Sequence, residues 1–284
     1  MGTAESDLVP SAWAGGSMEE WAQRLGVPRL EVYRRLPSTN LRARELVAEG
    51  AADLTAVVAG AQTEGRGRGG ARWHSAEDSG LWISFVLPIR PGTISAVLPL
   101  AVGVAAARAI EAASGALVGL KWPNDLLLGD RKVGGVLCEM VGGESVAGES
   151  AVLAGIGVNL RPPRVGVPQE LLSTATYLEE VCGAPVAEPD LARLLAMELR
   201  CWANPPPPTV SEKLRAEWEA RDRLRRAEVM CEGGLRGVVL GIADDGGLVI
   251  VDGDGRKTVV RSGSVRLTTP GESAALHTRR GRES

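Results

Sequence analysis

The sequence predicts an α/β (α+β) protein made of a large domain and a small C-terminal β-barrel. In the first three quarters of the chain, apolar runs of strand length alternate with segments that carry helix start and stop signals. Closer to the C-terminus only short strand patterns remain, separated by turns rich in Asp and Gly. A chain of 284 residues is long enough for both parts. The expected divisions are a flexible segment at 1–29, the large domain at 30–224, the barrel at 225–269 and a disordered tail at 270–284.

The composition is that of a soluble globular protein. Apolar residues make up 44% of the chain, charged residues 24%, and the net charge is −3, so a basic nucleic-acid surface is not indicated. The chain opens without a basic and apolar leader and has no run of about 18 apolar residues, which predicts a cytoplasmic location. The cysteines are isolated, so we expect reduced thiols, and no directly ligated metal can be assigned. They are Cys138, Cys182, Cys201 and Cys231.

The N-terminal segment carries one helix signal before the first strand. Ser17 can cap a helix, and Glu20 can complete a capping box with it. The first strand is expected at Leu30–Leu36, since Pro37 ends that run.

Polar residues at Ser38–Asn40 open the next helix, which is expected at Leu41–Glu49 and is stopped by Gly50. Such residues satisfy the free N–H groups of a helix N-terminus, so capping alone explains them until a ligand is implied elsewhere. A continuous apolar run at 54–61 then predicts a strand buried on both faces. This strand brings Gln62 to the edge of the loop that follows.

A glycine loop with two arginines, Gly65–Gly70, is the most informative stretch. Backbone N–H groups of such a loop can approach a ligand closely, and the guanidinium groups of Arg66 and Arg68 match a carboxylate or phosphate. An anionic ligand is predicted, with a solvated surface turn as the alternative. The glycines also fit the dinucleotide fingerprint, but a strand at 81–87 follows where that fingerprint needs a helix. The phosphate-binding P-loop and the protein-kinase motifs are absent from the sequence.

Between the loop and the next strand stand two ring side chains. Trp73 is either a core aromatic residue or a flat surface for a ligand. A histidine in the position of His74 more often has no catalytic role than acts as a general base. A helix rich in Ala is expected at 94–113, with Pro99 in an early turn where its missing N–H costs least. We expect this helix to pack in the core.

A β-hairpin carries the second informative stretch. Two apolar strands flank the turn Gly129–Asp130, and Trp122–Asp125 interrupts the first strand with a Pro turn that aims its last two side chains the same way. Lys132 follows the hairpin turn and can reach a bound anion, because Gly134–Gly135 opposes it with no side chains. Asn159 ends the strand that comes next, as one more polar group at a strand end.

The last third of the chain predicts two helices and the small barrel. The first helix is expected at Asp190–Trp202 with Asp190 as its cap, the four prolines at 205–208 form a stiff connector, and the second helix is expected at Ser211–Leu224. The barrel strands are expected at 238–242, 248–251 and 257–261.

Five of these motifs stand in the order and spacing of the biotin protein ligase family, which the chain resembles from about Val32 to Leu267. Their joint occurrence is far more specific than any single motif. They are Ser38-Thr-Asn40, Gly65-Arg-Gly-Arg-Gly-Gly70, Lys121-Trp-Pro-Asn-Asp125, Lys132-Val-Gly-Gly135 and Gly155-Ile-Gly-Val-Asn159. The resemblance implies the short form without an N-terminal DNA-binding domain, and a class II aminoacyl-tRNA-synthetase-like catalytic domain with a mixed sheet plus an SH3-like barrel. Gly69, Ala71 and His74 depart from the family pattern and affect its expected nucleotide contacts.

The resemblance also implies roles for individual residues. The expected catalytic residues are Lys132, Arg66 and Arg68. The residues expected to contact biotin are Ser38, Thr39, Asn40, Gln62, Gly65, Arg66, Gly67, Arg68, Lys132 and Gly135. The residues expected to contact ATP and the adenylate are Arg68, Trp73, Asn124, Asp125, Lys132 and Asn159.

The activity that the resemblance implies is ATP-dependent biotin ligation. Biotin would be activated as biotinyl-5'-AMP and transferred to a lysine of the biotin carboxyl carrier domain of acyl-CoA carboxylases. Mg²⁺ is expected to accompany ATP, held mostly by phosphates with Asp125 as a contributor. A monomer or weak homodimer is expected, with no membrane partner and no specific DNA.

Three other functions remain as alternatives. A lipoate or octanoate ligase shares the architecture and could use an equivalent lysine, but the arginine loop and the Trp-Pro-Asn-Asp motif argue against it. A DNA-binding, biotin-responsive regulator would need a helix-turn-helix, and only one short helix signal precedes Ser38. The third is a pure binding module in which the barrel docks a partner and the large domain is inert.

Overall fold

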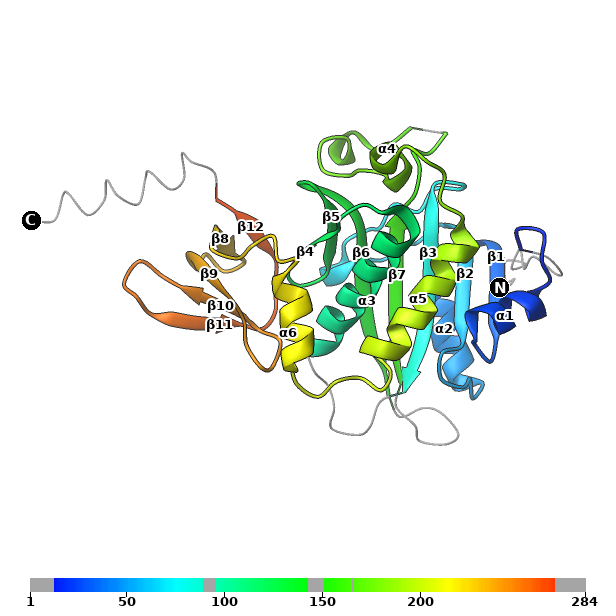
Figure 1. The fold of residues 1–284 in the computed structure, drawn as a ribbon, viewed down its shortest axis with the longest axis horizontal. Coiled ribbons are helices and arrows are strands. Elements are labelled where there is room, and N and C mark those ends of the chain that lie inside the picture. Colours follow the sequence, from blue (N-terminus) through cyan, green and yellow to red (C-terminus); the bar gives the residue numbers. More distant parts are fainter. Residues whose placement is uncertain (1–12, 89–95, 143–150, 165, 269–284) are drawn as a thin grey trace, which may run out of the picture.

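The computed structural model describes residues 13–88, 96–142, 151–164 and 166–268 (Figure 1). Seven strands form one sheet in the order β1-β2-β3-β7-β6-β5-β4, and five strands form a second sheet in the order β11-β10-β9-β8-β12. Strands β1 and β2 run parallel, whereas the other neighbours in the large sheet run antiparallel. The predicted fold class, a mixed-sheet α/β domain with a small β domain after it, is confirmed.

The elements of the large domain follow the sequence prediction closely. Its strands are β1 (Leu30–Leu36), β2 (Ala56–Gln62), β3 (Gly80–Pro88), β4 (Gly119–Lys121), β5 (Asp125–Leu128), β6 (Arg131–Val141) and β7 (Ala151–Asn159). Its helices are α1 (Met18–Leu25), α2 (Thr39–Ala48), α3 (Val97–Ser114), α4 (Leu178–Cys182), α5 (Glu188–Trp202) and α6 (Glu212–Glu219), with single 3-10 turns η1 (Arg68–Gly70) and η2 (Gln169–Leu171).

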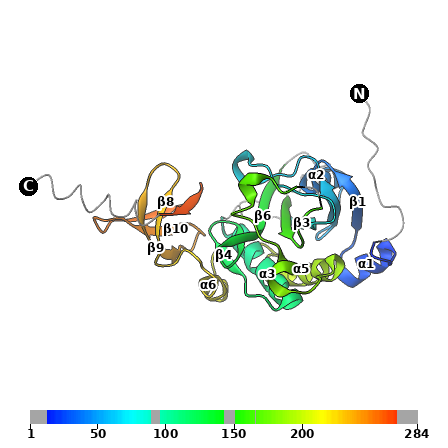
Figure 2. The same ribbon diagram turned by 90° about the horizontal axis from the view of Figure 1, so that it is seen from above.

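Helices cover both faces of the large sheet, with α2 on one side and α3 and α5 on the other (Figure 2). Strand β2 shows why its sequence is apolar throughout. Ala56 and Val58 lie in the core under α3 and α5, while Val57 and Ala59 lie in the core under α2. Because successive side chains of a strand point to opposite faces, a strand buried on both sides needs an unbroken apolar run.

Helix α3 has the length and composition of a membrane span, and 67% of that stretch is buried inside the protein. Its Ala-rich surface packs against α5 and the sheet, so its apolar character is that of a core helix. Pro99 lies in its first turn, as predicted. The expected start of this helix at 94–95 lies outside the described residues.

The N-terminal segment carries the predicted capping box at the start of α1. The Ser17 hydroxyl accepts from the Glu20 N–H at 3.2 Å, and the Glu20 carboxylate accepts from the Ser17 N–H at 2.8 Å. Trp21 and Leu25 are buried in the core that also holds α5. From Trp13 onward, therefore, the segment expected to be flexible is packed on the large domain, while residues 1–12 and the expected tail at 270–284 lie outside the described residues.

Several helix boundaries differ from the prediction. Helix α2 begins at Thr39, two residues before the expected Leu41. Helix α5 begins at Glu188 with Ala187 at the cap position, so Asp190 lies in the first turn and is not the cap. Pro189 explains the earlier start, because the fixed φ of proline suits the first turn of a helix. Helix α6 ends at Glu219, five residues before the expected end, and the chain after it runs beside β4 instead.

The C-terminal domain is a five-stranded antiparallel sheet at one end of the molecule (Figure 1). Its strands are β8 (Glu228–Cys231), β9 (Arg236–Ile242), β10 (Leu248–Val251), β11 (Lys257–Val260) and β12 (Val265–Leu267). The sequence predicted β9, β10 and β11 but missed β8 and β12. These two are three or four residues long, too short to show a periodic pattern. Strand β12 pairs with β8 across more than 30 residues, and β8 also pairs with β9.

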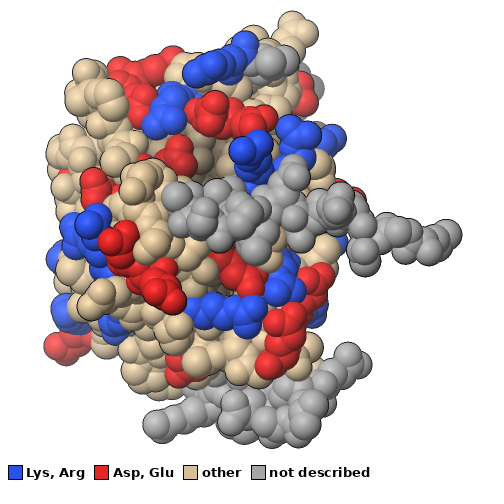
Figure 3. All heavy atoms as spheres, turned by 90° about the vertical axis from the view of Figure 1, so that its right-hand side faces the viewer, with Lys and Arg blue, Asp and Glu red and all other residues tan. Residues whose placement is uncertain are grey.

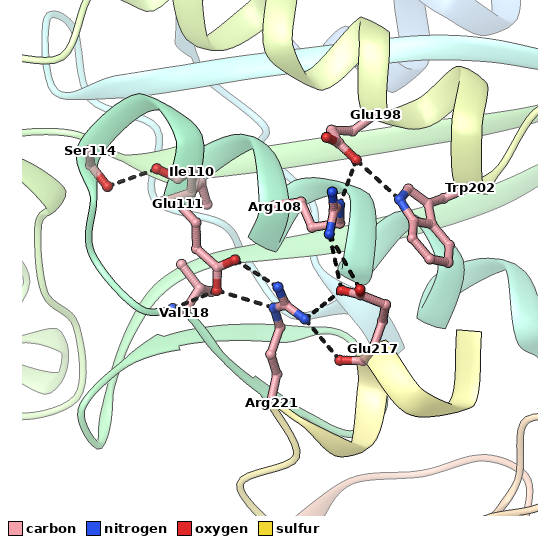
Figure 4. A network of polar contacts seen from close by, with 9 residues as sticks. All are labelled: Arg108, Ile110, Glu111, Ser114, Val118, Glu198, Trp202, Glu217 and Arg221. Carbon is pink, nitrogen blue, oxygen red and sulfur yellow. Dashed lines mark hydrogen bonds and ion pairs between the residues drawn. The ribbon is translucent and has the colours of Figure 1, made fainter. Parts of the chain in front are cut away.

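A network of ion pairs fixes α6 against the two core helices (Figure 4). The Glu198 carboxylate, almost fully buried, accepts from Arg108 at 2.9 Å and from the Trp202 indole at 3.0 Å. Glu217 of α6 pairs with Arg108 at 3.3 Å and with Arg221 at 2.7 Å. Residues 220–227 then connect α6 to β8, so the network anchors the segment that leads into the C-terminal domain.

Candidate active site

A cavity of about 270 Å³ opens between the start of α2, the glycine loop and the middle of strands β6 and β7. The turn between β4 and β5 closes one side, and two residues of the C-terminal domain complete the wall. Most of the residues expected to contact biotin or ATP line it: Ser38, Thr39, Asn40, Gln62, Arg66, Gly67, Arg68, Trp73, Asn124, Asp125, Lys132 and Gly135.

One end of the cavity is neutral and rich in hydrogen-bonding groups. The Gln62 amide oxygen accepts from the Thr39 backbone N–H at 2.8 Å, and its amide nitrogen donates to the Ser75 hydroxyl at 2.8 Å. Ser38 occupies the cap position of α2 without making a side-chain cap bond. Capping alone therefore does not explain Ser38, and all four side chains are buried or half-buried.

Behind this end, a buried polar cluster supports Thr39. The Ser84 hydroxyl of β3 lies 2.7 Å from the Thr39 hydroxyl and 2.6 Å from the Asn40 amide oxygen. The Asn40 amide nitrogen donates to the Glu139 carboxylate at 2.7 Å. Gly155 of β7 makes room for this amide, since a Cβ there would lie 2.5 Å from the Asn40 oxygen.

The opposite end of the cavity is cationic. The Lys132 ammonium forms an ion pair with Asp125 and lies 5.0 Å from the centre of the Trp73 ring, within cation–π distance. The side chain of Lys132 is 33% exposed and that of Asp125 is 21% exposed. A charged group at this depth can reach a bound anion and is still partly hydrated.

Trp73 lies across a platform of glycines from two neighbouring strands. Gly135 of β6 and Gly157 of β7 are register partners, and a Cβ on them would lie 3.2 Å and 2.7 Å from the indole. The ring also meets Trp82 edge to face, with centroids 6.4 Å apart. Of the two interpretations of Trp73, the ligand surface is therefore the one that its position in the cavity wall supports.

The glycine loop forms the roof. Gly69 and Gly70 have positive φ angles of 62° and 79°, which few residues other than glycine adopt. The Arg68 guanidinium donates to the Gly263 carbonyl of the C-terminal domain at 3.4 Å, whereas that of Arg66 has no polar partner among the described residues. A second hollow of about 410 Å³ lies beside the loop, lined by residues 66–70 together with Leu137 and Glu139.

Two of the expected contact residues lie outside the cavity wall. Gly65 packs against the Trp73 carbonyl so closely that no Cβ fits, which makes it a support of the loop. The Asn159 amide donates to the backbone carbonyls of Lys132 at 3.4 Å and Thr176 at 3.2 Å. Asn159 thus holds the strand that carries Lys132.

Several lining residues carried no signal in the sequence. Ser264 and Val265 come from the C-terminal domain, and Leu137 and Ile156 are ordinary strand residues. Only the position of Trp82 on the β3 strand adjoining the loop could have suggested a place near the site. Cys138 lies next to Leu137, and burial raises the pKa of its thiol to about 12, so it stays a neutral thiol at neutral pH.

Within the described residues, groups of three or more His, Cys, Asp or Glu side chains able to hold a metal ion do not occur. Asp125 is the single carboxylate that the described part of the chain contributes to the cavity wall. The site thus joins a neutral polar end to a cationic end under a glycine roof. Such a lining suits a small ligand that is uncharged and polar at one end and anionic at the other.

Comparison with known proteins gives the family. The model of the biotin/lipoate A/B protein ligase family matches residues 32–159. The bifunctional ligase/repressor BirA of Bacillus subtilis is 33% identical over 232 residues, 79% of this chain and 70% of that protein. The biotin--[acetyl-CoA-carboxylase] ligase of Mycobacterium tuberculosis is 31% identical over 258 residues, 84% of this chain and 89% of that protein.

The solved structures agree with the sequence relatives. The biotin protein ligase from Aquifex aeolicus in complex with biotin and ATP has a TM-score of 0.70 at 28% identity, covering 85% of this chain and 100% of that one. The chain belongs to the biotin protein ligase family, and it is a ligase enzyme. The resemblance inferred from the five sequence motifs is confirmed.

Proposed function

We propose that this chain activates biotin with ATP and transfers it to a lysine of a biotin carboxyl carrier domain. The observation that carries the proposal is the two-ended cavity, neutral at Thr39 and Gln62 and cationic at Lys132. Biotin has a neutral cyclic urea at one end and a carboxylate at the other, so it matches both ends. The names of the relatives, which include a biotin--[acetyl-CoA-carboxylase] ligase, support the same activity.

The first step joins two anions. A carboxylate oxygen of biotin attacks the α-phosphorus of ATP, the bond from that phosphorus to the bridging oxygen breaks, and pyrophosphate leaves. Lys132 and the loop arginines offset the repulsion between the carboxylate and the phosphates, and their effect increases as charge develops in the transition state. Asn124, Asp125 and Trp73 surround the place where the nucleotide would lie.

The second step transfers the biotinyl group. The neutral amine of a carrier lysine attacks the acyl carbon, the carbon–oxygen bond to AMP breaks, and the amine loses a proton as the amide forms. The glycine loop, with Arg66 and Arg68, would cover the adenylate and keep water away from it. No nucleophilic side chain of this protein is needed, in line with the neutral thiol of Cys138.

The cofactor and partners follow from the same chemistry. Mg²⁺ would be held mostly by the phosphates, with Asp125 as one protein ligand, and it would neutralise phosphate charge. The acceptor would be a carrier domain of an acyl-CoA carboxylase, and we place the enzyme in the cytoplasm as a monomer or weak homodimer. On the face drawn in Figure 3, acidic and basic side chains are interspersed, so the coloured part of this face shows no continuous basic surface. We predict no specific DNA binding.

One incubation tests this function. The enzyme is mixed with labelled biotin, ATP and Mg²⁺, with and without a biotin carrier domain, and label on the carrier is counted. Transfer that needs both ATP and the carrier lysine is expected. Lipoate replaces biotin in a parallel arm, and transfer of lipoate without transfer of biotin would refute the proposal in favour of a lipoate ligase. An operator-like gel shift with the purified chain would overturn the prediction on DNA.

A further inference from the structure

Glu139 is a charged residue in the polar cluster that the function proposed above does not use. It lies on β6, half-buried beside the second hollow, and its carboxylate accepts a hydrogen bond from the Asn40 amide at 2.7 Å. Asn40 itself is 4% exposed and belongs to the first turn of α2, next to Thr39 in the cavity wall. A carboxylate therefore ends a hydrogen-bonded chain that leads to the ligand cavity.

The orientation of the Asn40 amide depends on Glu139. An ionised carboxylate only accepts hydrogen bonds, and so does the Leu137 carbonyl, 3.5 Å from the same amide nitrogen. If the amide were reversed, its oxygen would face both of these acceptors. The Ser84 hydroxyl on the other side can donate or accept, so it does not select either orientation. Glu139 at 2.7 Å, with the Leu137 carbonyl at the longer distance of 3.5 Å, thus fixes which end of the amide faces Ser84.

The orientation of the Asn40 amide then determines the direction in which the hydroxyl groups of Ser84 and Thr39 donate their protons. The Asn40 oxygen faces Ser84 at 2.6 Å and takes its single proton. Ser84 can then only accept from Thr39, whose hydroxyl also has the Gln62 amide oxygen as an acceptor at 3.2 Å. Either way the Thr39 proton stays inside the protein, and the Thr39 oxygen offers only lone pairs to the cavity.

We propose that Glu139 is a positioning residue that, through Asn40 and Ser84, makes Thr39 an acceptor for an N–H group of the ligand. This inference rests on the proposed function, because the N–H group is assigned to the cyclic urea of biotin. A dithiolane ring, as in lipoate, has no such donor. The same buried chain thus gives the neutral end of the cavity its preference for a urea.

Replacing Glu139 by Gln removes the charge and keeps the shape. A glutamine can present either its oxygen or its nitrogen to Asn40, so neither amide orientation is favoured by charge. We expect Glu139→Gln to raise the Kd for biotin about tenfold, which equals about 1.4 kcal/mol. The Kd for desthiobiotin, which keeps the urea and lacks the sulfur, should rise by the same factor. The Kd for ATP should stay within about twofold of the parent value.

A second variant tests the polarity directly. Asn40→Asp places a carboxylate against Glu139 and should abolish measurable biotin binding. In the double variant Asn40→Asp with Glu139→Gln, the amide of the introduced glutamine can donate to the new carboxylate, whose other oxygen still accepts from Ser84. Binding should then return to within about tenfold of the parent, because donor and acceptor are matched again.

Isothermal titration of each purified variant with biotin, desthiobiotin and ATP is the measurement. The surface variant Glu77→Gln, at a residue whose side chain is 61% exposed, is the matched control and should bind as the parent does. Failure of the parent to bind biotin would refute the function, not this inference alone. If the parent binds biotin and Glu139→Gln binds it equally well, the positioning role is wrong. The role is also wrong if Glu139→Gln loses as much affinity for ATP as it loses for biotin. A double variant no better than Asn40→Asp alone would also contradict it.

Discussion

Removal of the charge at Lys132 should slow the formation of the adenylate far more than it weakens biotin binding. The Lys132 ammonium pairs with Asp125 at the cationic end of the cavity and lies over the Trp73 ring. Negative charge gathers on the phosphate oxygens as the carboxylate attacks, so a cation placed there interacts more strongly with the transition state than with the bound substrates. Lys132→Gln keeps most of the side-chain volume and removes the charge.

The size of the effect follows from exposure and pairing. Two unit charges about 4 Å apart at an effective dielectric constant of about 20 interact by about 4 kcal/mol. The Lys132 side chain is 33% exposed and its charge is shared with Asp125, so hydration and that partner lower the interaction. We expect about 2 to 3 kcal/mol to remain, which is roughly a 30- to 150-fold loss of rate.

Single-turnover release of pyrophosphate, at saturating biotin and ATP, measures this step. Lys132→Gln should show the rate loss while the Kd for biotin changes by less than about threefold. Lys132→Arg is the control that retains the charge. A Lys132→Gln enzyme that releases pyrophosphate at the parent rate would refute the assigned role.

Three further predictions concern the roof, the platform and the helix layer. Arg66→Gly should still form the biotinyl adenylate but should raise the rate at which the adenylate leaves the enzyme, so that lysines of other proteins are labelled. An adenylate that stays bound as long as in the parent enzyme would contradict this. Gly157→Ala places a Cβ 2.7 Å from the Trp73 indole nitrogen and should raise the Kd for ATP about tenfold by titration, whereas an unchanged Kd for ATP would mean that the indole does not face the nucleotide. Glu198→Gln weakens the buried contact with Arg108 and should lower the free energy of unfolding by about 1 to 2 kcal/mol. In a thermal scan Tm should fall by about 3 to 6 °C, and an unchanged Tm would mean that the network adds no stability.

The sequence by itself determined the local elements of this protein and which polar residues stand at their ends. The apolar run at 54–61, the turn at Gly129–Asp130 and the start of α1 at Ser17 each carry a pattern that spans a few residues. Hydrophobic period, turn chemistry and capping act over that same range, so they can be read from the chain. The five family motifs added the reaction, and the comparisons confirmed the family.

The tertiary structure alone decided which partners those residues find. Asn40 is 99 residues from Glu139, Ser84 is 45 residues from Thr39, and Arg68 is 195 residues from Gly263. The short edge strand β12 likewise pairs with β8, which lies more than 30 residues earlier in the chain. Such contacts depend on strand register and on helix packing, which place residues side by side whatever their distance along the chain. A local periodic pattern does not specify which distant residues come into contact. For this reason the hydrogen-bonded chain from Glu139 to Thr39 could be recognised only in the folded protein.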